Sequence, residues 1–159
     1  LAGAAQAIRG MRGLGFSVVM VTNQSGIGRG LFTLEQYERV HEEVLRQLEA
    51  AGAALDDAYF CPDDPDLEDG TRVTCRKPSE FMYRAAQAEL GIDLRRSYYV
   101  GDKVTDVTPA DLFGGVGILV RTGKGLVAEP EVGAHHRVVD NLEGAYELIR
   151  GLERPDPHR

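Results

Sequence analysis

The stretch Ser97-Tyr98-Tyr99-Val100-Gly101-Asp102-Lys103-Val104-Thr105-Asp106 joins a short apolar run to a polar turn. Residues 97–100 predict a strand, and residues 105–113 predict a helix with Pro109 near its first turn. A strand that runs directly into a polar turn and a helix is typical of parallel α/β sheets, in which ligands bind beyond the carboxyl ends of the strands. Asp102 would therefore lie where a hard oxygen ligand can reach Mg²⁺.

The same alternation of strands and helices runs through the rest of the chain. Further strands are predicted at residues 17–21, 57–61, 116–120 and 137–139, and further helices at 4–14, 34–50, 80–90 and 142–152. Polar loops are expected at 23–30 and 62–74. This order predicts an α/β protein with a doubly wound, mostly parallel, Rossmann-like sheet. We expect one domain at residues 1–152, followed by a disordered tail at 153–159.

Composition excludes several classes of partner. The 159 residues carry 18 Lys and Arg against 25 Asp and Glu, a net charge of −7, which argues against nucleic acid or an anionic membrane as the main partner. No apolar run approaches the length of a bilayer span. Two cysteines do not make a disulfide framework, so the sequence favours a reducing, cytoplasmic location.

A second polar strand end follows residues 17–21. Thr22 and Asn23 offer a hydroxyl and an amide, and the glycine-rich segment after Gln24 exposes backbone N–H groups. Such groups can hold phosphoryl oxygens without carrying charge. The alternative is that Thr22 and Asn23 only cap a turn.

Two adjacent cations form a third polar point. Lys77 is a compact charge suited to a phosphate, and Arg76 can fork onto a second phosphate or a sugar oxygen. Both could instead be solvated surface cations. Asp106 lies one helical turn after Asp102, where it could anchor the loop, hold a metal-bound water or act as a first-turn helix acid.

The motifs Thr22-Asn23-Gln24-Ser25-Gly26, Cys75-Arg76-Lys77-Pro78 and Gly101-Asp102-Lys103-Val104-Thr105-Asp106 resemble, in this order, those of the haloacid dehalogenase superfamily. Within it, the chain is similar to the branch of heptose bisphosphate and histidinol phosphatases. The similarity extends over about residues 1 to 150 and implies a core without a large cap domain.

The resemblance implies a Mg²⁺-dependent phosphatase that acts through an aspartyl-phosphate on a small phosphorylated sugar, with histidinol phosphate as the alternative substrate. Small members of the branch suggest a monomer. On matching positions, Thr22 would bind the transferring phosphoryl group and Lys77 would neutralise its charge. Asp102 would bind Mg²⁺, with Asp106 supporting it at the metal site. The implied substrate contacts are Asn23, Gln24, Arg29, Arg76 and Lys103.

The family's nucleophile motif, Asp-x-Asp-Gly-Thr, does not occur in the 159 residues. Asp64-Pro65-Asp66 has the carboxylate spacing, but it lies in a polar loop and lacks the Gly-Thr. The sequence begins with Leu1 rather than Met, and in this fold the motif ends a central strand, so we expect it upstream of Leu1. If it were truly absent, the protein would be a phospho-ligand-binding pseudoenzyme.

The branch often holds a structural zinc ion in a loop, and the matching positions here read Cys61, Asp63, Val73 and Cys75. Val73 cannot bind a metal, and two thiolates with one carboxylate make a poor closed zinc site. We therefore expect no structural Zn²⁺ and two free thiols. His41, His135 and His136 have no metal-ligand partner at a useful spacing and are expected to be structural.

Overall fold

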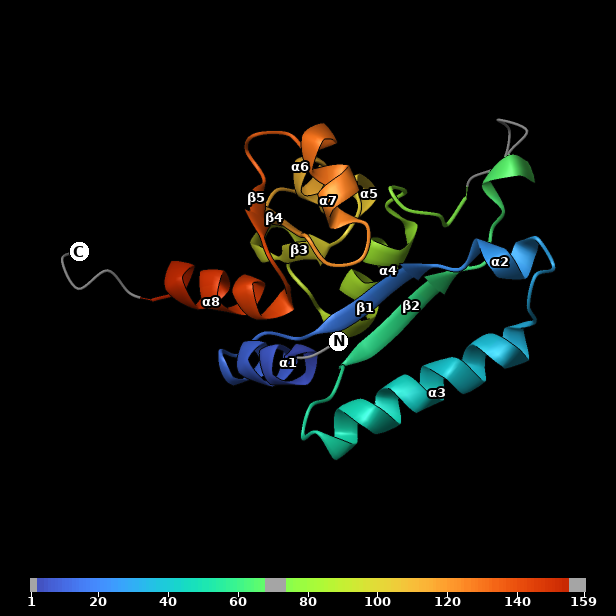
Figure 1. Ribbon diagram of the computed structural model, residues 1–159, viewed down its shortest axis with the longest axis horizontal. Helices are drawn as coiled ribbons and strands as arrows, with labels where there is room; N and C mark the ends of the chain where they lie inside the picture. Colours follow the sequence, from blue (N-terminus) through green and yellow to red (C-terminus); the bar gives the residue numbers. More distant parts are fainter. Residues whose placement is uncertain (1–2, 68–73, 155–159) are drawn as a thin grey trace. The chain divides into compact units, whose positions relative to one another are not determined.

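The computed structural model describes residues 3–67 and 74–154. It divides into two compact units (Figure 1). Residues 18–93 form the first, which we call the continuous unit. Residues 1–17 and 94–159 form the second, which we call the split unit. The predicted tail beyond residue 154 and the position of Val73 lie outside the described residues.

The continuous unit contains a two-stranded parallel sheet. Its strands are β1 (Val19–Asn23) and β2 (Asp57–Cys61), paired from Val19 with Asp57 to Asn23 with Cys61. Its helices are α2 (Ser25–Gly28), α3 (Leu34–Ala50), the 3-10 turn η1 (Pro65–Leu67) and α4 (Phe81–Leu90). The predicted capping box starts α3: the Thr33 hydroxyl accepts from Gln36 N at 3.2 Å, and Thr33 N donates to Gln36 Oε1 at 2.8 Å.

Two predicted boundaries in this unit are wrong. The strand expected at 17–21 runs instead from Val19 to Asn23, because Thr22 and Asn23 continue the ladder opposite Phe60 and Cys61. The loop expected at 23–30 contains helix α2. A Cβ atom on Gly26 would lie 2.1 Å from the Phe32 ring, so this glycine permits close packing rather than a flexible loop.

The split unit contains a three-stranded parallel sheet with strand order β3-β4-β5. Its strands are β3 (Tyr98–Gly101), β4 (Val116–Val120) and β5 (Arg137–Val139). Its helices are α1 (Ala4–Gly13), α5 (Val104–Val107), α6 (Pro109–Phe113), α7 (Gly125–Ala128) and α8 (Leu142–Leu152), with 3-10 turns η2 (Leu94–Arg96) and η3 (Glu129–Glu131).

Helices cover both faces of this sheet, as a doubly wound fold requires. Consecutive strand residues point to opposite faces. The Tyr99 ring stacks on Phe113 of α6 at a centroid distance of 6.3 Å, whereas the Tyr98 hydroxyl donates to Glu153, just beyond α8, at 2.6 Å. Ile118 and Leu119, neighbours in β4, are both fully buried, so the central strand is the core of the unit.

The helix predicted at 105–113 is two short helices that meet at Thr108. Pro109 is the first residue of α6 and has no N–H to continue the α5 hydrogen bonds. The Thr108 hydroxyl donates to the carbonyl of Val104 at 2.8 Å. The other predicted elements lie within three residues of their observed bounds, and the parallel α/β class is confirmed, with the strands in two parallel sheets. The described residues contain no large inserted cap domain.

Candidate active site

Asp106 anchors the loop that follows β3. One of its carboxylate oxygens, Oδ2, accepts hydrogen bonds from the backbone N–H groups of Asp102 and Lys103, both at 3.1 Å. Asp106 is buried, and a Cβ on Gly101 would lie 2.3 Å from the Cβ of Asp106. Glycine is therefore needed directly before Asp102. Of the roles that the sequence left open for Asp106, the geometry supports the anchoring one.

A second contact fixes the side chain of Asp102. The backbone N–H of Lys124 donates to Asp102 Oδ2 at 2.8 Å, from the turn that follows the neighbouring strand β4. Gly123 has φ +62°, and a Cβ there would lie 2.2 Å from the same oxygen. Among the described residues, Asp102 Oδ1 has no hydrogen-bond partner. The sequence places Gly123 and Lys124 in a glycine-rich turn after a strand, and that pattern alone assigned them no role at the site.

The continuous unit has its own polar strand end, at β1. Asn23 Oδ1 accepts from the backbone N–H of Lys77 at 2.9 Å, and Asn23 Nδ2 donates to the Lys77 carbonyl at 3.3 Å. The Lys77 ammonium donates to the carbonyl of Val21 at 2.7 Å. These bonds join residues more than fifty positions apart and hold the Lys77 ammonium at the end of β1.

Thr22 and Gln24 complete this strand end. Gln24 Nε2 donates to Thr22 Oγ1 at 3.1 Å, and Gln24 N donates to the Cys61 carbonyl at 2.7 Å. Because the Thr22 hydroxyl accepts from Gln24, its proton remains available to an acceptor such as a phosphoryl oxygen. The structure gives Gln24 a positioning contact with Thr22, while a direct substrate contact of Gln24 stays a prediction.

The predicted arginine contacts differ in their surroundings. Arg29 makes ion pairs with Asp64 at 2.9 Å and Asp66 at 2.8 Å, and the hydrogen bond to Asp64 raises the pKa of Arg29. Its guanidinium is thus engaged by carboxylates. Arg76 Nη1, in contrast, is buried and has no hydrogen-bond partner within residues 3–67 and 74–154. Lys103 is exposed at the loop after β3.

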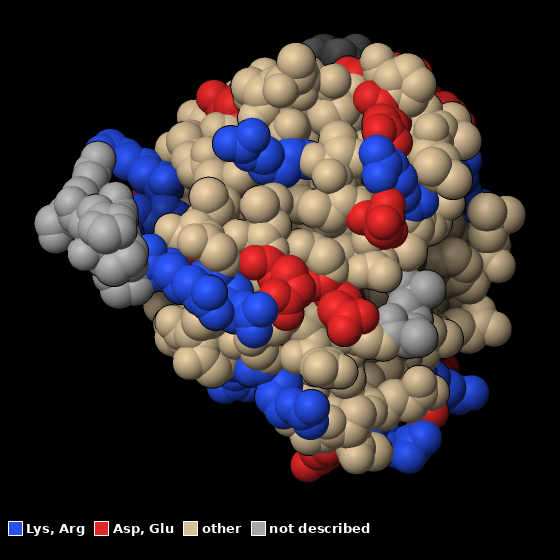
Figure 2. All heavy atoms as spheres, turned by 60° about the vertical axis from the view of Figure 1, so that its left-hand side comes forward, with Lys and Arg blue, Asp and Glu red and all other residues tan. Residues whose placement is uncertain are grey.

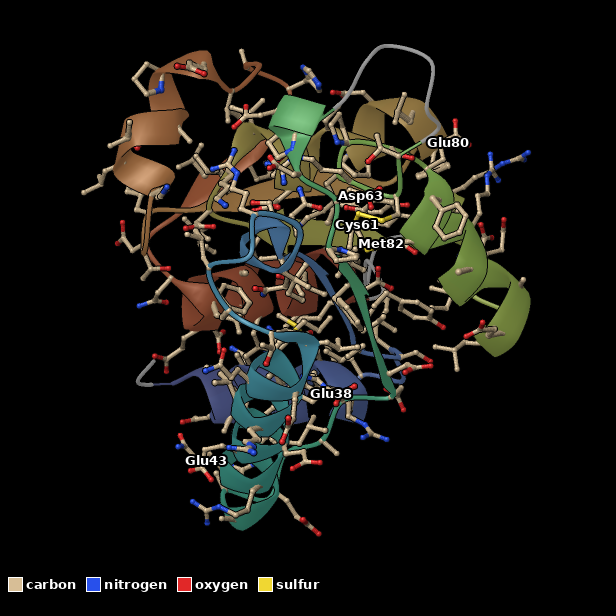
Figure 3. The ribbon with its side chains drawn as sticks, turned by 90° about the vertical axis from the view of Figure 1, so that its right-hand side faces the viewer. Glu38, Glu43, Cys61, Asp63, Glu80 and Met82 are labelled. Atoms are coloured by element: carbon tan, nitrogen blue, oxygen red, sulfur yellow. A yellow bond between two sulfur atoms is a disulfide. The ribbon has the colours of Figure 1, made fainter. Side chains whose placement is uncertain are left out.

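The two cysteines correct one expectation. Cys61 at the end of β2 and Cys75 are joined by a disulfide with Cα atoms 5.5 Å apart, so they are not free thiols (Figure 3). Asp63 Oδ2 accepts from the Thr74 hydroxyl at 3.0 Å and from Cys75 N at 3.2 Å. The chain therefore returns to the end of β2 directly before Arg76 and Lys77, which sequence separation alone does not reveal.

The predicted site residues form two groups that belong to different units. The continuous unit brings Thr22, Asn23, Gln24 and Lys77 together at the end of β1, and the split unit brings Asp102 and Asp106 together at the end of β3. One group supplies a hydroxyl and a cation, and the other supplies an oriented carboxylate. Such groups suit the binding of a phosphate and a hard divalent cation.

Comparison with known proteins agrees with this chemistry. A family model described as HAD-hydrolase-like matches residues 74–145, which include Lys77, Asp102 and Asp106. This match indicates the class of haloacid dehalogenase-like hydrolases.

Similar proteins define the family more closely. The chain is 45% identical over 137 residues to D-glycero-beta-D-manno-heptose-1,7-bisphosphate 7-phosphatase of Yersinia pestis, covering 83% of this chain and 72% of that protein. It is 38% identical over 157 residues to the protein of the same name in Escherichia coli K12, covering 96% and 82%. A solved D,D-heptose 1,7-bisphosphate phosphatase from B. bronchiseptica, complexed with magnesium and phosphate, has a TM-score of 0.84 at 33% identity and covers 96% and 84%. The chain therefore belongs to the family of these heptose bisphosphate phosphatases, within the haloacid dehalogenase-like hydrolases.

Proposed function

We propose that the protein hydrolyses the 7-phosphate of D-glycero-D-manno-heptose 1,7-bisphosphate, with Mg²⁺ as its cofactor. The observation that carries this proposal is the 45% identity to a phosphatase of that name over 83% of the chain. The ordered carboxylate of Asp102 and the held ammonium of Lys77 support it, because both are needed to bind a metal-associated phosphate.

In the proposed reaction, a nucleophilic aspartate forms a bond to phosphorus while the bond from phosphorus to the sugar oxygen breaks. A second aspartate gives its proton to the leaving oxygen and then removes one from the water that hydrolyses the aspartyl-phosphate. Thr22 would donate to a phosphoryl oxygen, and Lys77 would offset the negative charge of the nucleophile and phosphate.

The proposed reaction takes both aspartates from an Asp-x-Asp-Gly-Thr motif, which does not occur in the 159-residue sequence. Each sheet has an edge that can accept the strand carrying them: among the described residues, β1 pairs only with β2 and β3 pairs only with β4. A strand that paired with either edge would satisfy backbone groups that the present neighbours leave unpaired.

The donor set at β3 fits Mg²⁺. This ion prefers one or two carboxylates together with phosphate and water oxygens. Asp102 offers such a carboxylate, oriented by Lys124 N and supported by Asp106. When bound there, Mg²⁺ would neutralise phosphate charge. We assign Asp102 as its ligand and Asp106 as the residue that holds the Asp102 loop.

Arg76 favours a bisphosphate over the alternative, histidinol phosphate. Its buried Nη1 has no partner among the described residues, and a buried guanidinium nitrogen needs an acceptor. The second phosphate of a heptose bisphosphate would provide one, whereas histidinol phosphate offers a cationic amine in place of a second anion. Asn23, Gln24, Arg29 and Lys103 remain weaker candidates for substrate contacts.

The test is a hydrolysis assay with the complete natural protein, Mg²⁺ and a panel of phosphate monoesters. We expect the heptose 1,7-bisphosphate to have the highest kcat/KM, and Asp102→Asn to weaken Mg²⁺ binding and turnover strongly. Arg76→Ala should reduce kcat/KM for the bisphosphate more than for histidinol phosphate. A higher kcat/KM for histidinol phosphate would select that alternative. No turnover of any compound, with phosphate still bound, would select the pseudoenzyme.

A second experiment tests whether the two groups share one phosphate. Binding of inorganic phosphate in the presence of Mg²⁺ is measured for Lys77→Ala, Asp102→Asn and the double variant. We expect strongly non-additive losses, because residues that contact one ligand are coupled. Additive losses would mean that Lys77 and Asp102 act at separate places.

The proposal extends to carbohydrate metabolism in the cytoplasm and to a monomeric protein. No helix among the described residues is long and apolar enough to cross a membrane. Positive and negative side chains both occur on the face that Figure 2 shows. The net charge of −7 supports a small-molecule rather than a nucleic-acid partner. Sedimentation of the purified protein checks its mass, and a dimer would contradict this part.

A further inference from the structure

Two histidines and an aspartate meet in the split unit, away from the loop that carries Asp102. His135 Nε2 lies 2.6 Å from Asp111 Oδ1, and His136 Nε2 lies 3.3 Å from Asp111 Oδ2. The two imidazole rings are 4.0 Å apart between centroids. This convergence corrects the expectation that His135 and His136 have no ligand partner, because Asp111 reaches them from α6, 24 residues earlier than His135.

From Asp111, His135 and His136 we infer a binding site for a divalent transition-metal ion such as Zn²⁺. The three donor atoms all lie within 4.8 Å of one another. Zinc binds imidazole nitrogen and carboxylate oxygen at about 2.0–2.2 Å, so two donors on one tetrahedral ion are about 3.4 Å apart. Small side-chain adjustments therefore bring all three atoms to bonding distance.

The surroundings order one ligand and leave the others accessible. The His136 side chain is 5% exposed, whereas those of Asp111 and His135 are 44% and 66% exposed. His136 N donates to the carbonyl of Gly133 at 2.9 Å, in the turn that directs both rings toward Asp111. A Cβ on Gly117 of β4 would lie 2.3 Å from His136 Nδ1, so the glycine makes room for the ring. A metal ion can thus approach from solvent onto a ligand that is already oriented.

The ligand chemistry separates this site from a magnesium site. Imidazole nitrogen suits zinc, copper, nickel and cobalt, whereas Mg²⁺ prefers oxygen. The hydrogen bond from His135 lowers the pKa of Asp111, which keeps the carboxylate charged at neutral pH. Metal binding would replace the contacts that the two imidazoles now make with the Asp111 carboxylate.

The position of the site suggests a structural effect. Asp111 belongs to α6, and His136 directly precedes β5. The histidine therefore lies at the amino end of β5, where the pairing of β4 with β5 begins. Asp102 follows the carboxyl end of β3, at the opposite end of the sheet. At about 3.3 Å per residue, this is roughly 10 Å farther along the strands than His136. A bound ion would join α6 to the start of β5 without contacting the proposed phosphate site.

The test titrates the complete protein with Zn²⁺ alone, in a background of millimolar Mg²⁺, by calorimetry and thermal unfolding. We expect one zinc equivalent that Mg²⁺ does not displace and a rise in Tm. His135→Ala and Asp111→Asn should weaken this binding by at least about tenfold, with phosphatase activity unchanged. His41→Ala serves as the control that removes an imidazole elsewhere. Equal zinc binding by the wild type, His135→Ala and Asp111→Asn would overturn the proposal.

Two further measurements keep the outcome clear. Gly117→Ala leaves all three ligands in the chain but displaces the His136 ring, so it should weaken zinc binding, while Gly13→Ala, whose Cβ would meet no atom within 4 Å, should not. Co²⁺ in place of Zn²⁺ should give visible absorption without a thiolate charge-transfer band. A thiolate band would place the ion at Cys61 and Cys75 instead and would contradict the inference.

Discussion

The side-chain amide of Asn23 holds the backbone of Lys77 at both its N–H and its carbonyl group, at 2.9 and 3.3 Å. The end of β1 thereby fixes the residue that carries the proposed phosphate-binding ammonium. Asn23 therefore positions Lys77. The sequence predicted Asn23 only as a substrate contact.

Removal of this amide should misplace Lys77. Asn23→Ala leaves a half-buried N–H and a carbonyl without their partner, so we expect a loss of about 1–3 kcal/mol in the free energy of unfolding. It should also lower kcat/KM, while Lys77→Ala lowers kcat/KM with little loss of stability. Denaturant unfolding and steady-state assays of both variants check this. An Asn23→Ala protein with wild-type activity would show that the Lys77 position does not depend on Asn23.

Gly123 should control metal binding through its lack of a side chain. Gly123→Ala forces an unfavourable conformation at φ +62° and places a Cβ 2.2 Å from Asp102 Oδ2, so the carboxylate must move. Gly91→Ala is the matched control, since Gly91 has φ +67° and open space around the Cβ position. Both variants should lose about 1–2 kcal/mol of stability. Only Gly123→Ala should weaken Mg²⁺ binding, measured by calorimetry, and an equal effect of both would contradict this reading.

The disulfide should stabilise the segment that precedes Arg76 and Lys77. Cys61 and Cys75 are separated by 14 positions, and closing a loop of this size contributes about 3 kcal/mol in the chain-entropy model. Cys75→Ser, or reduction of the wild type, should therefore lower both the stability and kcat/KM. Alkylation of the native protein before reduction provides the check on the bond itself. Labelling of both cysteines at that stage would show free thiols, as a reducing cytoplasm would produce.

Tyr98 should make stability fall in alkaline solution. Its burial and its hydrogen bond to Glu153 raise the pKa of Tyr98 to about 12, above the usual value of 10.0. The folded state therefore keeps this proton longer than the unfolded state, so the contribution is complete below pH 10 and disappears as the pH rises through about 12. Tyr98→Phe should be less stable than the wild type at pH 8 by about 0.5–1.5 kcal/mol. The difference should vanish near pH 12, as denaturant titrations would show, and a constant difference would contradict the assignment.

The sequence predicts the elements well where their signals are local. The Thr33 and Gln36 capping box starts α3 as expected, and the apolar run of β4 is a buried central strand. Periodicity and capping depend on neighbours within a few residues, so a single sequence displays them. Local order also favours the parallel arrangement, because parallel neighbouring strands need a crossover connection, which is usually a helix.

Predictions fail where residues distant in the chain decide the contact. The two hydrogen bonds of Asn23 to Lys77, the hold of Lys124 on Asp102 and the approach of Asp111 to His135 and His136 each depend on how strands and turns meet in space. The extension of β1 through polar Thr22 and Asn23 has the same cause, because their partners Phe60 and Cys61 lie far along the chain. Residue type shows what such groups can do, but only the fold shows what they touch.

The split unit joins two helices that lie far apart in the sequence, since α1 packs on α8. During synthesis, α1 leaves the ribosome well before residues 142–152, so Ile8 and Met11 cannot yet be buried against α8. All residues of the continuous unit, 18–93, are synthesised before α8 is complete. Until residues 142–152 emerge, the nascent chain exposes the apolar side of α1, which a chaperone could bind.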